Sequence, residues 1–133
     1  MKNKQETRLD KMFSESTRKR AILRAGGCER CGTGKFDIVK ENGDTLPAWK
    51  QLQCCHCFGR AKRSTRWDEE DAAGLCGGCH MFIDAQHDHK EALFRKLIGD
   101  DRYELLELRA NTPQKIDRDL VELYLIEKLK ELE

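Results

Sequence analysis

The sequence of 133 residues lacks several features that mark whole classes of protein. No apolar run approaches the roughly 18 residues of a membrane-spanning helix. Residues 1–6 lack the apolar segment of a signal peptide, which argues against export. We therefore expect a cytoplasmic protein with no membrane association, forming one domain over residues 1–133.

Aliphatic side chains are scarce in the first half of the chain. Only seven of the 23 Ile, Leu and Val residues lie in residues 1–67. A segment this poor in aliphatic side chains buries little apolar surface, so it needs another source of stability. The cysteines are the candidate source.

Charge is unevenly divided, although the net charge is only +1. Residues 1–67 hold 16 Lys and Arg against 7 Asp and Glu, while residues 68–133 hold 9 against 17. A basic segment is typical of nucleic-acid-binding proteins, because contacts of Lys and Arg with phosphates provide most non-specific affinity. A solvated charged surface is the alternative.

Seven cysteines are present, and an odd number without an export signal argues against a disulfide framework. Cys28-x-x-Cys31 and Cys76-x-x-Cys79 each bring two thiolates to one turn. Two such pairs complete a tetrahedral, closed and therefore structural zinc site. Redox-active or simply buried cysteines are the alternative.

A further group of cysteines, Cys54, Cys55 and Cys57, lies in a segment typical of a strand. Residues 54 and 57 of a strand point to opposite faces and chelate one ion poorly. We therefore leave these three cysteines out of the zinc site.

Local patterns predict an α+β fold. We expect helices over residues 7–24, 79–85, 89–98, 101–110 and 113–132, the first ended by Gly26 and Gly27 and the last capped by Thr112. Asp88 and Asp101 begin the capping boxes of two of these helices. Strands are expected over residues 36–40, 49–57 and 64–67, with a loop over 41–47 and a basic hairpin loop over 59–63.

The order of these motifs resembles the HNH, or ββα-metal, nuclease family. The resemblance is carried by His56 at the end of a strand, by Gly59-Arg60, by Arg66-Trp67-Asp68 and by Leu75-Cys76-x-x-Cys79-His80. Residues 52–84 are especially similar to small phage-type HNH endonucleases and NinG-type recombination-associated proteins. The resemblance implies a small ββα-metal core over residues 28–88, held by the four-cysteine zinc site. A basic N-terminal helix (1–27) and C-terminal helices (89–133) would flank it.

The resemblance also implies metal-dependent hydrolysis of DNA. His56 resembles the general base that takes a proton from water, as a neutral imidazole can near pH 7. His80 would hold a divalent cation, Mg²⁺ or Mn²⁺, together with Asp71. Asp84, one helical turn after His80, is a further candidate ligand. The alternative for His56 is a role as zinc ligand.

Two positions depart from the family's pattern. Asp71 stands where the motif has its middle asparagine, and a carboxylate there can ligate a metal or anchor the hairpin. Cys55 stands directly before the histidine, where the wider family often has Asp or His, so a hard oxygen or imidazole ligand is lost.

The basic hairpin is the expected DNA contact. By resemblance, Arg60, Lys62, Arg63 and Arg66 would grip phosphates while the hairpin and the following helix enter the minor groove. This predicts little sequence preference. A solvated loop is the alternative.

The C-terminal segment carries two apolar stripes on nearly opposite faces. Either the domain covers both stripes, or one stripe packs on the domain and the other contacts a partner or a second copy in a homodimer; the scarcity of aliphatic residues in the first half favours the partner contact. The stripes are Ile116, Leu120, Leu123 and Tyr124, and Val121, Leu125, Leu129 and Leu132.

These expectations favour an HNH-type deoxyribonuclease, an endonuclease or nickase of phage or prophage DNA processing or recombination in a bacterial host cell. A catalytically silent, zinc-held DNA-binding module is the alternative, suggested by Asp71 and Cys55. A thiol redox or metal-sensor protein is a third hypothesis.

Overall fold

A computed structural model describes residues 3–133 and shows an α+β fold, as expected. Five helices and two small antiparallel sheets are found in this part of the chain. The helices are α1 (Lys4–Ala25), α2 (Gly77–Ala85), α3 (His87–Ile98), α4 (Asp100–Ala110) and α5 (Arg118–Glu131). The strands are β1 (Ile38–Val39), β2 (Thr45–Leu46), β3 (Gln53–His56) and β4 (Ala72–Leu75).

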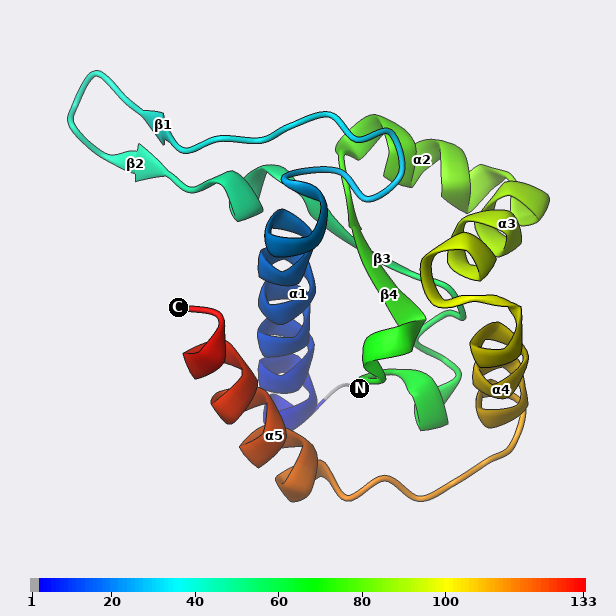
Figure 1. The fold of residues 1–133 in the computed structure, drawn as a ribbon. Helices are drawn as coiled ribbons and strands as arrows, with labels where there is room; N and C mark the ends of the chain where they lie inside the picture. The colour runs from blue at the N-terminus through cyan, green and yellow to red at the C-terminus, as the bar shows by residue number, and fades with distance from the viewer. Residues whose placement is uncertain (1–2) are drawn as a thin grey trace.

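The β3–β4 pair lies between α1 on one side and α2 and α3 on the other, and α5 covers the far side of α1 (Figure 1). In the register, Cys54 pairs with Gly74 and Cys55 with Ala73. A Cβ atom on Gly74 would lie 2.6 Å from Cβ of Ala21, so α1 approaches the sheet as closely as glycine allows. This close approach compensates for the small number of large aliphatic side chains in the first half.

The second strand of this sheet was predicted at the wrong residues. Residues 64–67 are not a strand, because Arg63–Thr65 forms a 3₁₀ turn and Arg66 is bound to Asp10 of α1. The pairing strand is Ala72–Leu75, whose sequence AAGL has neither alternation nor β-branched residues. Its four residues are all buried, so packing on both faces selects the strand.

The predicted helices agree with the structure within about three residues, except for the last one. Asn3 caps α1, and Gly26 ends it with φ of 68°. Helix α5 begins at Arg118, because Asp117 and not Thr112 accepts the N-terminal N–H, that of Leu120. The hydroxyl of Thr112 instead donates to Leu108 of α4. Gln86 and Gly99 hold the cap positions predicted for Asp88 and Asp101.

The predicted loop over residues 41–47 contains a strand. Ile38–Val39 pairs with Thr45–Leu46 in an arm that projects from the body of the molecule (Figure 1). The predicted strand over residues 49–57 is shorter, since Ala48–Gln51 forms a 3₁₀ turn before β3.

The two stripes of α5 have different environments. Leu125 is buried and packs with Val121 against Leu9 and Phe13 of α1. The other stripe is largely exposed, with Leu120 and Leu123 each 63% accessible. A partner or homodimer contact through this stripe stays a prediction. No helix within residues 3–133 is both long and apolar enough to cross a bilayer.

Candidate active site and metal centre

The cysteines of the two C-x-x-C pairs meet where β4 joins α2. The Sγ atoms of Cys28, Cys31, Cys76 and Cys79 all lie within 4.8 Å of one another, so the group could hold a metal ion such as zinc. The predicted grouping of these four residues is confirmed. Because the first pair follows α1 and the second follows β4, an ion there would tie α1 to the sheet.

Polar groups surround these sulfur atoms. The guanidinium of Arg30 donates to Cys79 Sγ at 3.3 Å, and the Thr33 hydroxyl lies 3.1 Å from Cys31 Sγ. The hydrogen bonds with Thr33 lower the pKa of Cys31 to about 6, whereas burial raises the pKa of Cys79 to about 12. Donors next to sulfur favour the thiolate, which is the form of cysteine that binds metals.

The remaining cysteines lie outside this group, as predicted. Cys54 packs towards Leu9 and Phe13, whereas Cys57 belongs to the core on the other side of the sheet. The opposite faces expected for residues 54 and 57 are thus observed. None of the seven cysteines forms a disulfide bond.

A groove of about 650 Å³ lies between α1, β3 and α2. It brings three of the predicted site residues, His56, His80 and Asp84, to one place. Three cationic side chains also line it, from α1, the hairpin loop and α3. The lining consists of Asp10, Ser14, Arg18, Leu52, Gln53, Cys54, His56, Gly59, Arg60, His80, Asp84 and Lys90.

His56 ends β3, and Asp71 orients its ring. Nδ1 of His56 lies 3.3 Å from Oδ2 of Asp71, and the ring stacks on Phe13 with 5.6 Å between centroids. Burial favours the neutral imidazole, but the hydrogen bonds with Asp71 and Cys54 outweigh it and raise the pKa of His56 to about 9. The sequence-based expectation of a neutral His56 ring near pH 7 is therefore corrected. The contact with Asp71 favours the imidazolium at that pH.

His80 and Asp84 form, with Cys55, a second group that could hold a metal ion. Donor atoms of these three residues all lie within 4.8 Å of one another. His80 and Asp84 are one turn apart on α2, and Nε2 of His80 lies 3.1 Å from Oδ2 of Asp84. Cys55 comes from β3, whose side chain at this position is buried.

Asp71 is not part of this group, contrary to its predicted pairing with His80. Within residues 3–133, the two groups of metal-ligating side chains are the four cysteines and the Cys55–His80–Asp84 group. Asp71 is fully buried, and its Oδ1 accepts the N–H of Phe58 at 2.8 Å. One oxygen of Asp71 therefore holds the turn after β3, and the other holds the ring of His56. Anchoring of the hairpin, the second role considered for this carboxylate, is what the geometry shows.

The four residues predicted to bind DNA have different surroundings. Arg60, Lys62 and Arg63 are exposed, and Arg60 also lines the groove. Arg66 is buried, and its guanidinium binds Asp10 through two hydrogen bonds of 2.7 and 3.0 Å. Arg66 therefore joins the hairpin to α1, and its predicted phosphate contact is corrected to this structural role.

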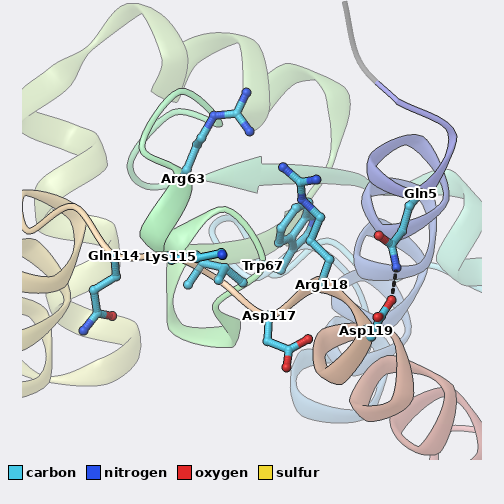
Figure 2. Close-up of a pocket in the computed structure, with 9 residues that line it drawn as sticks. Gln5, Arg63, Trp67, Gln114, Lys115, Asp117, Arg118 and Asp119 are labelled. Carbon is cyan, nitrogen blue, oxygen red and sulfur yellow. Dashed lines mark hydrogen bonds between the residues drawn. The ribbon is translucent and has the colours of Figure 1, made fainter.

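Arg63 lines a second cavity, which His56 does not line. This cavity of about 780 Å³ lies between the start of α1, the 3₁₀ turn at Arg63–Thr65 and the start of α5. Figure 2 shows Arg63, Lys115 and Arg118 around it, with Trp67 behind them. Glu6 binds both Arg63 and Arg118, at 3.2 and 2.8 Å.

Sequence reasoning missed several residues of the groove. Judged by residue type alone, Cys55 is a lost ligand, although it stands at the position where the family often has one. Gln53, Arg18 and Lys90 have no motif to mark them. Their roles depend on α1, β3 and α3 meeting at the groove, which local spacing does not reveal.

No family model, curated protein or solved structure matches this chain. The geometry of the groove and of the cysteine group is therefore the basis for the function proposed below.

Proposed function

We propose that this protein is a metal-dependent endonuclease or nickase of the HNH type that hydrolyses phosphodiester bonds of DNA. The observation that carries the proposal is the groove, which an oriented histidine lines together with cationic side chains and with His80 and Asp84, two members of a group that could hold a metal ion. A phosphodiester needs these three elements: a proton acceptor for water, a cation at the leaving oxygen, and positive charge for the phosphates.

His56 is proposed as the base. Its Nδ1 is held by Asp71, and Nε2, which lies 3.9 Å from the Cys54 thiol, is the atom that would take the proton of the attacking water. A divalent cation bound by Cys55, His80 and Asp84 would neutralise the departing 3′-oxygen and would also lower the pKa of His56.

Arg18, Arg60 and Lys90 are proposed to position the DNA. They come from α1, the hairpin loop and α3, so they surround the groove rather than forming one stripe. Cationic side chains that contact phosphates bind without reading bases, and the proposed activity accordingly has little sequence preference. The four-cysteine group is proposed to bind a structural zinc ion.

The test is relaxation of supercoiled plasmid DNA by the wild-type protein and by His56→Asn, over a series of divalent metals. Asparagine keeps a donor near the Nδ1 position and spares the buried carboxylate of Asp71. We expect the variant to lose activity by a factor of about 10²–10⁴ while its melting temperature and DNA affinity are unchanged. His87→Asn, at an exposed histidine outside the groove, is the matched control and should cleave normally.

A DNA-binding module without catalysis is the second candidate. The observation that favours it is the contact between His56 and Asp71, which holds the imidazole in its charged form. Tight DNA binding by a wild-type protein that cleaves with none of the metals would establish this candidate and refute the nuclease.

A further inference from the structure

The metal-binding group in the groove differs from the four-cysteine group in its donor atoms. It combines one thiol, one imidazole and one carboxylate, from Cys55, His80 and Asp84. Cys55 is completely buried, whereas His80 and Asp84 line the groove. Three protein ligands beside an open groove are the arrangement of a metal site that keeps a position free for a substrate or water.

The ring of His80 is held so that its Nε2 atom, the candidate metal ligand, faces the carboxylate of Asp84. Nδ1 of His80 lies 2.7 Å from Oε1 of Gln53, so this ring nitrogen donates its hydrogen to the amide. Nε2 then lies 3.1 Å from Oδ2 of Asp84. A proton on Nε2 or a metal ion held by both atoms satisfies this contact, so a metal ion can replace the proton without moving either side chain. An acceptor that holds the Nδ1 hydrogen is also the usual partner of a metal-binding histidine.

Asp84 is oriented towards the same point. Its Oδ1 binds the ammonium of Lys90 at 2.9 Å, which leaves Oδ2 directed at His80. The Cys55 thiol has no comparable partner, because its hydrogen bond, to the carbonyl of His56, is a weak one of 3.8 Å.

We propose that Cys55, His80 and Asp84 form a second metal centre selective for Zn²⁺ and other thiophilic ions, in place of the Mg²⁺ or Mn²⁺ that the resemblance implies. Thiolate and imidazole ligands suit zinc, whereas magnesium prefers oxygen ligands in octahedral geometry. The chain thus binds two zinc ions, a structural one in the four-cysteine group and an exchangeable one in the groove. This inference rests on the proposed function only in assigning the second ion to the hydrolysis of DNA.

The test begins with the full chain carrying one zinc ion in the four-cysteine group, to which Co²⁺ is then added. A cobalt–thiolate bond gives an intense charge-transfer absorption that oxygen and nitrogen ligands do not give. We expect wild-type protein to bind one equivalent of cobalt with this absorption while its zinc content stays at one. Cys55→Ser should lose the absorption. Cys57→Ser, at the other buried thiol of the strand region, should keep it.

Two further variants separate a ligand from a merely buried thiol. Gln53→Met removes the acceptor from His80, and we expect it to weaken cobalt and zinc binding about 10- to 100-fold without touching a ligand. Cys55→Asp should lose the absorption and gain affinity for Mn²⁺ relative to Zn²⁺. If Cys55→Ser does not fold, the cobalt absorption of the wild-type protein and the metal affinity of Gln53→Met still test the proposal.

The inference is overturned if zinc-loaded wild-type protein binds no cobalt, or binds it without the thiolate absorption. It is also overturned if Cys55→Ser takes up cobalt with the wild-type spectrum. Failure of the proposed function looks different: the protein would take up the second ion through Cys55 yet cleave no DNA. Cleavage with Mg²⁺ at the same rate in wild type and Cys55→Ser would support the nuclease and refute the thiophilic centre.

Discussion

The carboxylate of Asp71 lies 3.3 Å from Nδ1 of His56 and is completely buried beside it. Its second oxygen accepts the N–H of Phe58, two residues beyond the histidine. One side chain therefore fixes both the turn after β3 and the direction of the imidazole. The residue at position 71 and the candidate base act as one unit, although 15 residues separate them in the chain.

Asp71→Asn is expected to lower the pKa of His56 from about 9 towards its ordinary value of 6.5, because the anionic partner is removed. The raised pKa means that charged His56 stabilises the fold below about pH 6.5 and that this stability is lost as the pH rises through 9. Because burial raises the pKa of Asp71 to about 6, the ion pair is also lost as the pH falls through 6. The variant should flatten this part of the pH dependence. NMR titration of His56 and unfolding at several pH values measure both effects. Asp44→Asn, in the exposed arm, is the control.

Replacing one ligand of the structural site, as in Cys28→Ser or Cys76→Ser, is expected to remove one zinc ion and to unfold the protein. Zinc binding at such sites contributes about 10–16 kcal/mol, which is as large as the whole stability of a typical domain. Metal analysis and circular dichroism measure the two losses. Cys54→Ser should retain both the zinc and the fold, since Cys54 lies outside both metal-binding groups. A folded, zinc-free Cys28→Ser variant would contradict the assignment.

Arg60→Ala is expected to weaken DNA binding, whereas Arg66→Ala is expected to weaken the fold. Arg60 is exposed at the groove, so its loss should weaken binding to all duplex sequences and reduce the slope of log K against log salt by about one. Arg66 is buried against Asp10, so its loss should lower the free energy of unfolding by about 3 kcal/mol. Salt-dependent DNA titration and denaturant unfolding separate the two roles. Equal stability of both variants would argue against the structural role of Arg66.

Gly74→Ala is expected to destabilise the fold by about 1–3 kcal/mol, because the added methyl group would lie 2.6 Å from Cβ of Ala21. The helix and the sheet would have to move apart. Gly59→Ala is the matched control, since its methyl group would meet no atom within 4 Å. Denaturant unfolding compares the two, and a neutral Gly74→Ala would show that the contact between α1 and β4 can relax.

The spacing of residues in the sequence determined the features that depend on neighbours along the chain. Two C-x-x-C pairs identified the four-cysteine group, and the interval between His80 and Asp84 placed both on one face of α2. Gly26 and Gly99 marked the ends of two helices. These features were predictable because hydrogen bonding and ligand geometry within a turn are set by only a few adjacent residues.

Tertiary structure alone decided the features that depend on packing between distant segments. The AAGL segment is a strand because α1 and the core on the other face bury it, and no local pattern shows this. Arg66 is a structural residue because Asp10, 56 positions earlier, lies beside it on α1. Cys55 joins His80 and Asp84 only because β3 lies against α2. Burial and ion pairing depend on which surfaces meet, and in this protein those surfaces come from segments far apart in the chain.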